Sequence, residues 1–315
     1  MVIRICAKCK KKIVGIGVPY GGNCYHKSCF VCSYCGGKLM GSVTIYKGGL
    51  YHTMCNPASE LRICAYCRKL ITGRWYSLND KKYHEKCYHQ HIEKRCSVCG
   101  QSIHDKYYYD DWGNYAHVSH GSAKTKFCYT CGRIISSGAK SIGEGATLCN
   151  ICSSTSVTTD AEVEICRKKV ISVFKLLKIS GIPETIPIKL CPHDNMEGNL
   201  GCIYSVKVRD PKLANFHIHM TFGLPDLQFR GVLAHEMLHS WLTLYGREVT
   251  RDECEGFCNL GEASIYTKED TPFAHYLLKR MYKNADAIYG EGYRLQKERY
   301  EKLGWEGLLE SLRHK

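Results

Sequence analysis

The stretch Leu233-Ala234-His235-Glu236-Met237-Leu238-His239-Ser240-Trp241-Leu242 places the pattern H-E-x-x-H inside an almost unbroken apolar run. Residues four apart lie on one face of an α-helix, so His235 and His239 can bind one zinc ion together. Glu236 follows the first of them and can take a proton from a zinc-bound water. The alternative interpretation is a buried helix with two hydrogen-bonded histidines, and the rest of the chain has to decide between the two.

The residues on either side predict where this helix begins and ends. Pro225 and Asp226 provide a proline and an acid for the first turn. Gly246 provides a C-terminal stop. No helix-breaking residue lies between Val232 and Tyr245, so the two histidines are expected one turn apart.

A catalytic zinc needs a third protein ligand and an open position for water. The segment that follows, residues 250–263, carries four acids on a second predicted helix. Thr250, with Glu253 three residues later, predicts a capping box, which assigns Asp252 and Glu253 to the first turn. Glu255 and Glu262 remain as candidates for the third ligand.

Glu255 is the favoured ligand because of its neighbours. Gly256 would permit a close approach of the two helices. Asn259, one turn further on, can accept the free ring N–H of a ligand histidine. Cys254 and Cys258 are soft donors, for which buried packing is the alternative interpretation.

The cysteine content points to metal. The chain has 315 residues, which predicts two or more domains, and 21 cysteines. Its first residues lack the layout of a signal peptide, and its apolar runs are too short to span a membrane. We therefore expect a cytoplasmic protein whose cysteines bind zinc rather than form disulfides. Fifteen thiolates on five zinc ions would lower the formal charge of +14 to about +9, which is still basic.

One spacing recurs five times in the first 152 residues. A C-x-x-C pair is followed after 16 or 17 residues by a second pair of His and Cys residues, which together form the tetrahedral set of structural zinc. The residues between the pairs are expected to form a β-hairpin. The sets are Cys6, Cys9, His26 and Cys29; Cys32, Cys35, His52 and Cys55; Cys64, Cys67, His84 and Cys87; Cys96, Cys99, His117 and His120; and Cys128, Cys131, Cys149 and Cys152. In an alternative pairing, His89, His91 or His104 replaces one of these ligands.

The first two sets are separated only by Phe30 and Val31. Two zinc modules fused through so short an apolar spacer resemble a LIM domain, here residues 1–60. The other three sets have longer spacers and form a LIM-like region, residues 61–156, which ends at a Ser/Thr-rich stretch. LIM domains commonly bind proteins, so partner proteins are expected. The hairpin pattern does not favour nucleic acid, which would call for basic helices between the ligand pairs.

From residue 157 to 315 the pattern changes to helices with a few strands, an α+β domain. An amphipathic helix is predicted from Val163 to Leu177. Strands are predicted at residues 186–190, 201–208 and 216–222. The last of these precedes the H-E-x-x-H helix, like the edge strand along which zinc peptidases align a substrate.

Two smaller expectations complete this half. His217 and His219 alternate with apolar residues in the third predicted strand and should face away from the core. The final stretch, residues 294–314, predicts two packed helices broken at Gly304 rather than a membrane anchor.

The order of these features is similar to that of a known family. A LIM domain, a LIM-like region, H-E-M-x-H-x-W-L at residues 235–242, E-G-x-C at residues 255–258 and Y-G-E-G-Y-R at residues 289–294 resemble the DA-one type of LIM-domain metallopeptidase. In plants this family comprises ubiquitin-activated regulators of organ size. The resemblance implies a gluzincin-type zinc endopeptidase that cuts selected regulatory proteins. It assigns the catalytic zinc to His235, His239 and Glu255, and catalysis to Glu236.

The resemblance also bears on cofactors and partners. One catalytic zinc and five structural ones give about six zinc ions per chain. Plant members carry ubiquitin-interacting motifs ahead of the LIM domain, whereas only a few residues precede Cys6 here. Ubiquitin or ubiquitin-pathway partners therefore stand on the resemblance alone.

Two functional questions remain open at this point. Tyr289, Tyr293 and His275 are candidates for the donor that stabilises the oxyanion, with simple packing as the alternative. The competing function is a LIM adaptor whose peptidase fold is not catalytic. The intact H-E-x-x-H argues against it, because a site without activity has no need of Glu236.

Overall fold

The computed structural model describes residues 4–56, 62–71, 73–120, 127–136, 138–205 and 215–313. Packing divides the chain into two compact units, residues 1–94 and 95–315. The second unit combines the last two zinc-ligand sets with the C-terminal helices and strands. The predicted domain limits at residues 60 and 156 stay a prediction, because this division follows packing and not the repeat.

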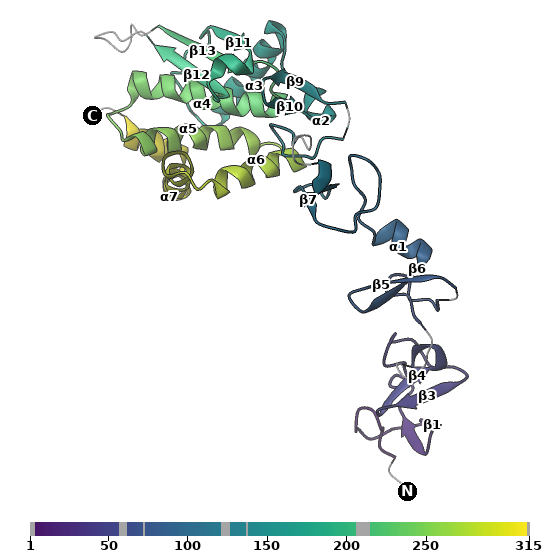
Figure 1. Ribbon diagram of the computed structural model, residues 1–315. Helices are drawn as coiled ribbons and strands as arrows, with labels where there is room; N and C mark the ends of the chain where they lie inside the picture. Colours follow the sequence, from purple (N-terminus) through teal and green to yellow (C-terminus); the bar gives the residue numbers. More distant parts are fainter. Residues whose placement is uncertain are drawn as a thin grey trace. The chain divides into compact units, whose positions relative to one another are not determined.

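An antiparallel hairpin lies between the two ligand pairs of every set in the first unit, as predicted (Figure 1). A short 3₁₀ or α-helix follows the second and third hairpins. The elements are β1 (Val18–Tyr20), β2 (Asn23–Tyr25), β3 (Val43–Tyr46), β4 (Gly49–His52), η1 (Thr53–Cys55), β5 (Trp75–Leu78), β6 (Lys81–His84) and α1 (Glu85–His91).

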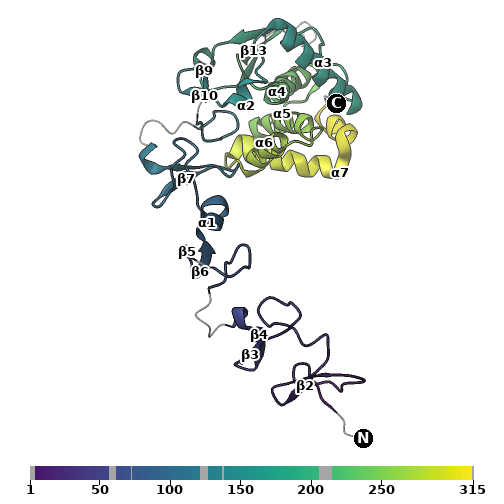
Figure 2. The ribbon, with the colours of Figure 1, turned by 90° about the vertical axis from the view of Figure 1, so that its right-hand side faces the viewer.

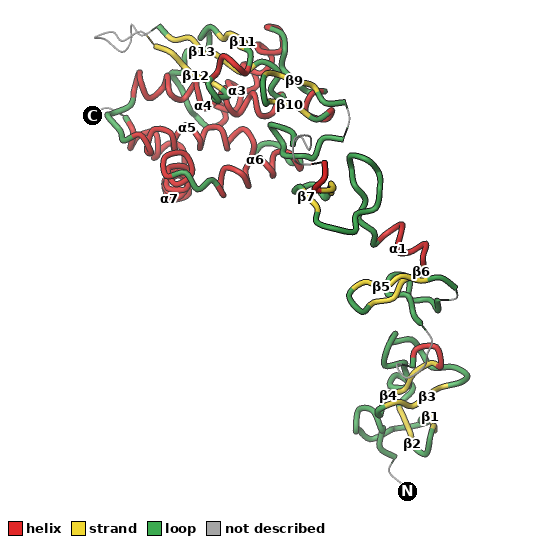
Figure 3. Tube along the Cα trace, viewed as in Figure 1, coloured by secondary structure: helices red, strands yellow, loops and turns green. Residues whose placement is uncertain are grey.

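The same arrangement continues at the start of the second unit, where strands and short helices alternate with loops (Figure 3). The elements are β7 (Tyr107–Tyr109), β8 (Tyr115–His117), η2 (Val118–His120), β9 (Lys140–Gly143), β10 (Ala146–Leu148) and α2 (Asn150–Ser153). All five spacings therefore fold as hairpins, and none of the described residues between the pairs forms a basic helix.

A three-stranded sheet follows the zinc-ligand sets. Its strands are β11 (Ile188–Cys191), β12 (Gly201–Ser205) and β13 (Phe216–Thr221), with η3 (His193–Met196) after the first. The order is β11-β13-β12, with β11 parallel and β12 antiparallel to β13. The expectation that residues 216–222 form the edge strand is therefore wrong, because β13 pairs on both sides. His217 and His219 do face away from the core, while Phe216, Ile218 and Met220 are buried.

Five helices complete the fold. They are α3 (Asp160–Leu176), α4 (Asp226–Tyr245), α5 (Arg251–Tyr266), α6 (Pro272–Lys283) and α7 (Gly292–Leu312), with the π-helical turn η5 (Ala287–Glu291) before the last. Helix α4 lies between the sheet and α5 (Figures 1 and 2). It is buried almost all round because its long apolar run packs against both. No helix among the described residues is long and apolar enough to cross a membrane.

The ends of α4 lie where the sequence predicts them, at Pro225 and Gly246. Gly246 ends the helix in an extended conformation (φ −78°, ψ 145°), not in the left-handed one. A Cβ there would lie 2.6 Å from the carbonyl oxygen of Leu242, so close packing explains the glycine. In α7, by contrast, Gly304 has φ 65° and breaks the helix as predicted.

Two predictions about α5 are wrong. Thr250 is the N-cap residue, but its side chain makes no capping hydrogen bond, and Glu253 instead accepts hydrogen bonds from Arg247 and Arg299 at 2.7 and 2.6 Å. Gly256 faces the start of α7, where a Cβ would lie 2.2 Å from the carbonyl oxygen of Gly292.

The contact of α5 with α4 depends on two other glycines. A Cβ at Gly261 would lie 2.1 Å from Leu238, and one at Gly231 would lie 2.3 Å from the hydroxyl of Tyr266. One glycine from each helix therefore sets the spacing that brings the acids of α5 against the H-E-x-x-H face.

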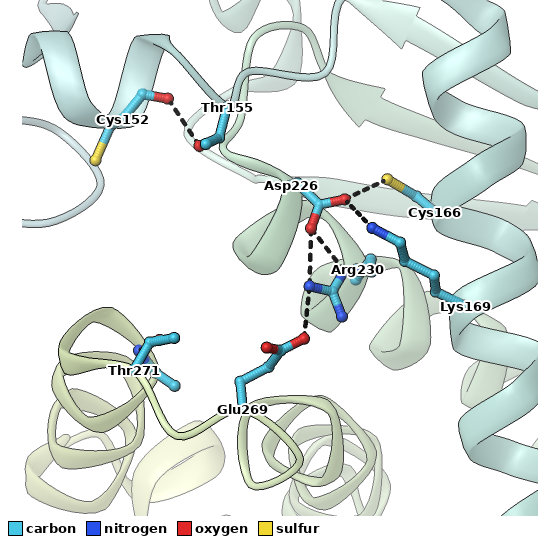
Figure 4. Close-up of polar contacts among 9 residues, drawn as sticks. Cys152, Thr155, Cys166, Lys169, Asp226, Arg230, Glu269 and Thr271 are labelled. Atoms are coloured by element: carbon cyan, nitrogen blue, oxygen red, sulfur yellow. Dashed lines mark hydrogen bonds and ion pairs between the residues drawn. The ribbon is translucent and has the colours of Figure 1, made fainter.

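A polar network fixes the start of α4 (Figure 4). The carboxylate of Asp226 accepts hydrogen bonds from Arg230 at 2.9 Å and from Lys169 of α3 at 3.2 Å. Arg230 also donates to Glu269, just after α5, at 3.0 Å. The network therefore joins the helices on both sides of the one that carries the histidines.

Candidate functional site

The structure brings each of the five predicted Cys/His sets together, with one potential ligand atom per residue within 4.8 Å of the others. The sets are Cys6, Cys9, His26 and Cys29; Cys32, Cys35, His52 and Cys55; Cys64, Cys67, His84 and Cys87; Cys96, Cys99, His117 and His120; and Cys128, Cys131, Cys149 and Cys152. Such sets fit zinc, which prefers four thiolate and imidazole ligands. No cysteine is in a disulfide. The Nδ1 atom of His89 lies 3.0 Å from the carboxylate of Glu93, and His89 does not join a set.

The first histidine of each of the first four sets is oriented by the backbone. Their Nδ1 atoms lie 3.3–3.5 Å from a cysteine sulfur of the same set. Their Nε2 atoms donate to a backbone carbonyl near the first pair: His26 to Lys12, His52 to Lys38, His84 to Leu70 and His117 to Ser102. The carbonyl fixes the tautomer that leaves Nδ1 free to bind a metal.

The first cysteine of four sets is prepared for the thiolate form. Burial raises the pKa of these thiols, but backbone hydrogen bonds outweigh it and lower the pKa to about 6. They are Cys6, Cys32, Cys64 and Cys96. In the all-cysteine set, hydrogen bonds from Cys131 and Cys152 hold the pKa of Cys128 well below its ordinary value. The sulfurs of Cys131 and Cys149 lie 3.7 Å apart.

A different cluster forms on the H-E-x-x-H face of α4. The Nε2 atoms of His235 and His239 lie 3.1 Å apart, and Oε2 of Glu255 lies 3.3 and 3.6 Å from them. Tetrahedral ligands at about 2.0–2.1 Å from a zinc ion lie roughly 3.3–3.4 Å from one another. The three atoms therefore fit one zinc ion and leave a fourth position open.

The charges at this cluster favour a cation. Burial lowers the pKa of His239, but hydrogen bonds to Cys254 and Glu255 outweigh it and raise the pKa to about 10. Burial raises the pKa of Glu255, but the two histidines outweigh it and lower the pKa to about 2. Burial raises the pKa of Glu236 above its ordinary value, opposed by the same histidines.

The outer ring nitrogens face α5, though not the residue predicted to hold them. The Nδ1 atom of His239 lies 3.5 Å from the sulfur of Cys254, and that of His235 lies 3.9 Å from Oε2 of Glu262. The hydroxyl of Tyr266 donates to the other oxygen of Glu262 at 2.7 Å. Asn259 instead donates to the carbonyl of Tyr289, so its predicted role beside a histidine is wrong.

The cluster lies in a cleft of about 1180 Å³. Gly201, Cys202 and Ile203 of β12 line one side, and Tyr276, Arg280 and Lys283 of α6 line another. Because β12 is at the end of the strand order, one of its edges is unpaired in this sheet, and its residues 201–203 line the cleft. The strand that can align a peptide here is therefore β12, and not β13 as the sequence predicts.

The three candidate oxyanion donors lie in different surroundings. Tyr289 lines the cleft. Tyr293 is buried, and burial raises its pKa to about 12. His275 is exposed and pairs with Asp270 at 3.3 Å. Only Tyr289 of the three lies in the cleft.

Sequence reasoning missed the part that the zinc-ligand sets play in the cleft. Tyr129, inside the fifth C-x-x-C pair, and Asp111, between the two ligand pairs of the fourth set, line the cleft. Spacing gave no signal for either, because both are non-ligand positions. Gln228 is also part of the lining, and its buried Oε1 has no hydrogen-bond partner among the described residues.

The comparisons with known proteins place the chain in a class. Residues 6–58 match the LIM domain, and residues 208–263 match a second family, DA1-like, so that the H-E-x-x-H helix and Glu255 lie in the second match. The chain thus contains a LIM domain, followed further along by a segment similar to the DA1-like family. The second family is described as Protein DA1, and the order of the two matches is consistent with the DA1 type, as the resemblance predicts. No curated protein matches the chain.

Proposed function

We propose that the chain is a zinc-dependent endopeptidase that cuts selected intracellular proteins. The observation that supports this best is the convergence of His235, His239 and Glu255 on one point beside Glu236, inside an open cleft. A structural zinc set has four protein ligands, whereas this one has three.

Each residue then has a defined part in the reaction. A zinc ion held by the three ligands would polarise a water molecule and the carbonyl of the peptide bond. Glu236 takes the proton of the attacking water and passes it to the leaving amine, for which its raised pKa is suited. Tyr289 is the candidate donor to the oxyanion. The outer edge of β12 binds the substrate as an added strand.

The LIM and LIM-like modules would recognise or restrain the substrate proteins. Zinc folds such small modules, and cysteines that bind zinc rather than form disulfides fit a reducing compartment such as the cytoplasm. Ubiquitin-pathway proteins are candidate partners by family resemblance only. The alternative function is a LIM adaptor whose peptidase-like fold binds partners without cutting them.

The decisive experiment compares the zinc-saturated chain with Glu236→Gln. This variant keeps the size of the side chain and all three ligands, so both forms should contain about six zinc ions. Partner proteins trapped by the variant are then incubated with each form. We expect the wild type to release fragments and the variant to release them at least about a hundredfold more slowly. Equal fragment patterns would favour the adaptor.

A further inference from the structure

One face of helix α6 forms a wall of the cleft. Tyr276, Arg280 and Lys283 follow one another at steps of four and three residues, which places them on the same side of the helix. All three line the cleft. The wall thus offers an aromatic ring followed by two positive charges.

These two charges are not neutralised, unlike the other positive charges of the cleft. Lys279 pairs with Asp111 at 3.0 Å, and Arg247 pairs with Glu253 at 2.7 Å. Among the carboxylates that the structure describes, none forms an ion pair with Arg280 or Lys283. Both side chains are exposed to the cleft solvent and free to bind a ligand.

The cleft that holds Arg280 is lined from three elements. Tyr129 of the fifth zinc-ligand set, Tyr276 of α6 and Glu262 of α5 line it together with Arg280. The guanidinium therefore shares the cleft with two tyrosines and with the residues around His235.

We infer that Arg280, supported by Lys283, forms a subsite for a carboxylate side chain of the substrate, so that the cleft selects proteins with an acidic residue near the cut bond. A guanidinium binds a carboxylate with two parallel hydrogen bonds, and Tyr129 and Tyr276 flank the position. The inference rests on the proposed function, because it specifies the substrate of the same cleft.

Binding to the uncut site tests this directly. The zinc-loaded Glu236→Gln chain is titrated with fluorescent, C-terminally amidated peptides that are identical except for Glu, Gln or Lys at the same positions. We expect the Glu peptide to bind about tenfold more tightly than the Gln peptide, the range of one charge-assisted hydrogen-bonded pair. Arg280→Glu should abolish this difference, and Arg280→Lys should retain part of it.

Two controls separate a subsite from general attraction to a basic chain. Lys302→Glu makes the same change in net charge on the exposed face of α7, outside the cleft, and should leave the preference intact. Equal losses in Arg280→Glu and Lys302→Glu would overturn the inference. A Gln peptide with a free C-terminus that binds as tightly as the Glu peptide would assign the subsite to a chain end and overturn the side-chain assignment.

Cleavage distinguishes this inference from the proposed function. Peptides from a chymotryptic digest of a cell lysate are incubated with the active chain, and new termini are identified by mass spectrometry. Enrichment of Asp or Glu at one fixed position, lost in Arg280→Glu, supports the inference. Cleavage without a preference for Asp or Glu would overturn the subsite inference and leave the proposed peptidase function intact. New termini that are identical with wild type and Glu236→Gln overturn the peptidase, and the binding experiment then decides on the subsite alone.

Discussion

At the scale of single residues, the two kinds of ligand cluster use opposite nitrogens of the histidine ring. In the repeats Nδ1 faces the sulfurs and Nε2 donates to a backbone carbonyl, as His26 does to Lys12. On α4 the Nε2 atoms face the cluster, and Nδ1 is left to side chains of α5. The orientation of the rings in the cleft therefore depends on side chains that a point mutation can remove.

Glu262 should position His235 through its Nδ1 atom. This nitrogen is buried, has no hydrogen-bond partner among the described residues, and lies 3.9 Å from the carboxylate. We expect Glu262→Gln to weaken zinc binding or lower kcat about 10- to 100-fold, because the amide holds the ring less firmly. Competition with a chelator measures the affinity, and steady-state kinetics measures kcat.

Tyr266→Phe is the matched control for this prediction. It removes only the hydroxyl that donates to the same carboxylate and should have a smaller effect in the same direction. If Glu262→Gln lowered thermal stability but left zinc affinity and kcat unchanged, Glu262 would be a packing residue only.

The sequence predicted the residues that converge but not the contacts around them. Spacing alone places His235 and His239 on one helical face. Elimination among the acids of α5 leaves Glu255 and Glu262, and the choice of Glu255 depended on two neighbours that make other contacts in the structure. The partner of Asn259 and the contact of Gly256 depend on how α5 is rotated between α4 and α7. That rotation is set by contacts between distant segments, such as Gly261 with Leu238.

At the scale of elements, local sequence signals predict the ends of a helix, whereas the order of the strands depends on contacts between distant segments. Local signals predicted both ends of α4 to within one residue, at Pro225 and Gly246. The alternating pattern of β13 is compatible with an edge or a centre, because it reports only which face is buried. Pairing with β11 and β12 decides the order, and both lie earlier in the chain.

Asp226 should stabilise the start of α4 in a pH-dependent way. Burial raises its pKa, but Arg230 and Lys169 outweigh burial, so the pKa in the folded chain is lowered. The stabilisation is therefore complete above the unfolded pKa of about 3.9 and disappears as the pH falls through the lower folded value. We expect Asp226→Asn to lower the free energy of unfolding by about 1–3 kcal/mol at pH 7, and by less below pH of about 4.

Urea unfolding at pH 7, at pH 5 and at a pH of about 3, below the unfolded pKa, followed by tryptophan fluorescence, measures this difference. Glu184→Gln is the control, because it removes the same charge from an exposed pair with Lys175 and should change stability little. An Asp226→Asn effect no larger than that of the control at pH 7 would contradict a stabilising network.

At the scale of the second unit, the fifth zinc-ligand set connects two walls of the cleft. The indole of Trp112 donates to the carbonyl of Cys131 at 2.7 Å, and its ring lies 5.4 Å from that of Tyr276 on α6. The ring of Tyr129 lies 4.8 Å from that of His193, in η3 before β12. Spacing in the sequence predicts only a closed zinc set for this module. In the structure its surroundings also pack against α6 and η3.

This connection predicts different effects for two equivalent glycines. Gly100 and Gly132 each follow the second cysteine of a C-x-x-C pair and have φ values of 74° and 68°. An alanine at either position costs about 1–2 kcal/mol of backbone strain. At Gly100 nothing lies within 4 Å of the new Cβ, whereas at Gly132 the hydroxyl of Tyr276 would be 2.6 Å away.

We therefore expect both substitutions to lower the melting temperature, but only Gly132→Ala to displace Tyr276 and weaken binding of the acidic peptide. Zinc content, thermal unfolding and peptide titration of the two variants measure this. Equal peptide affinities in Gly100→Ala and Gly132→Ala would mean that the fifth set supports the fold without shaping the cleft.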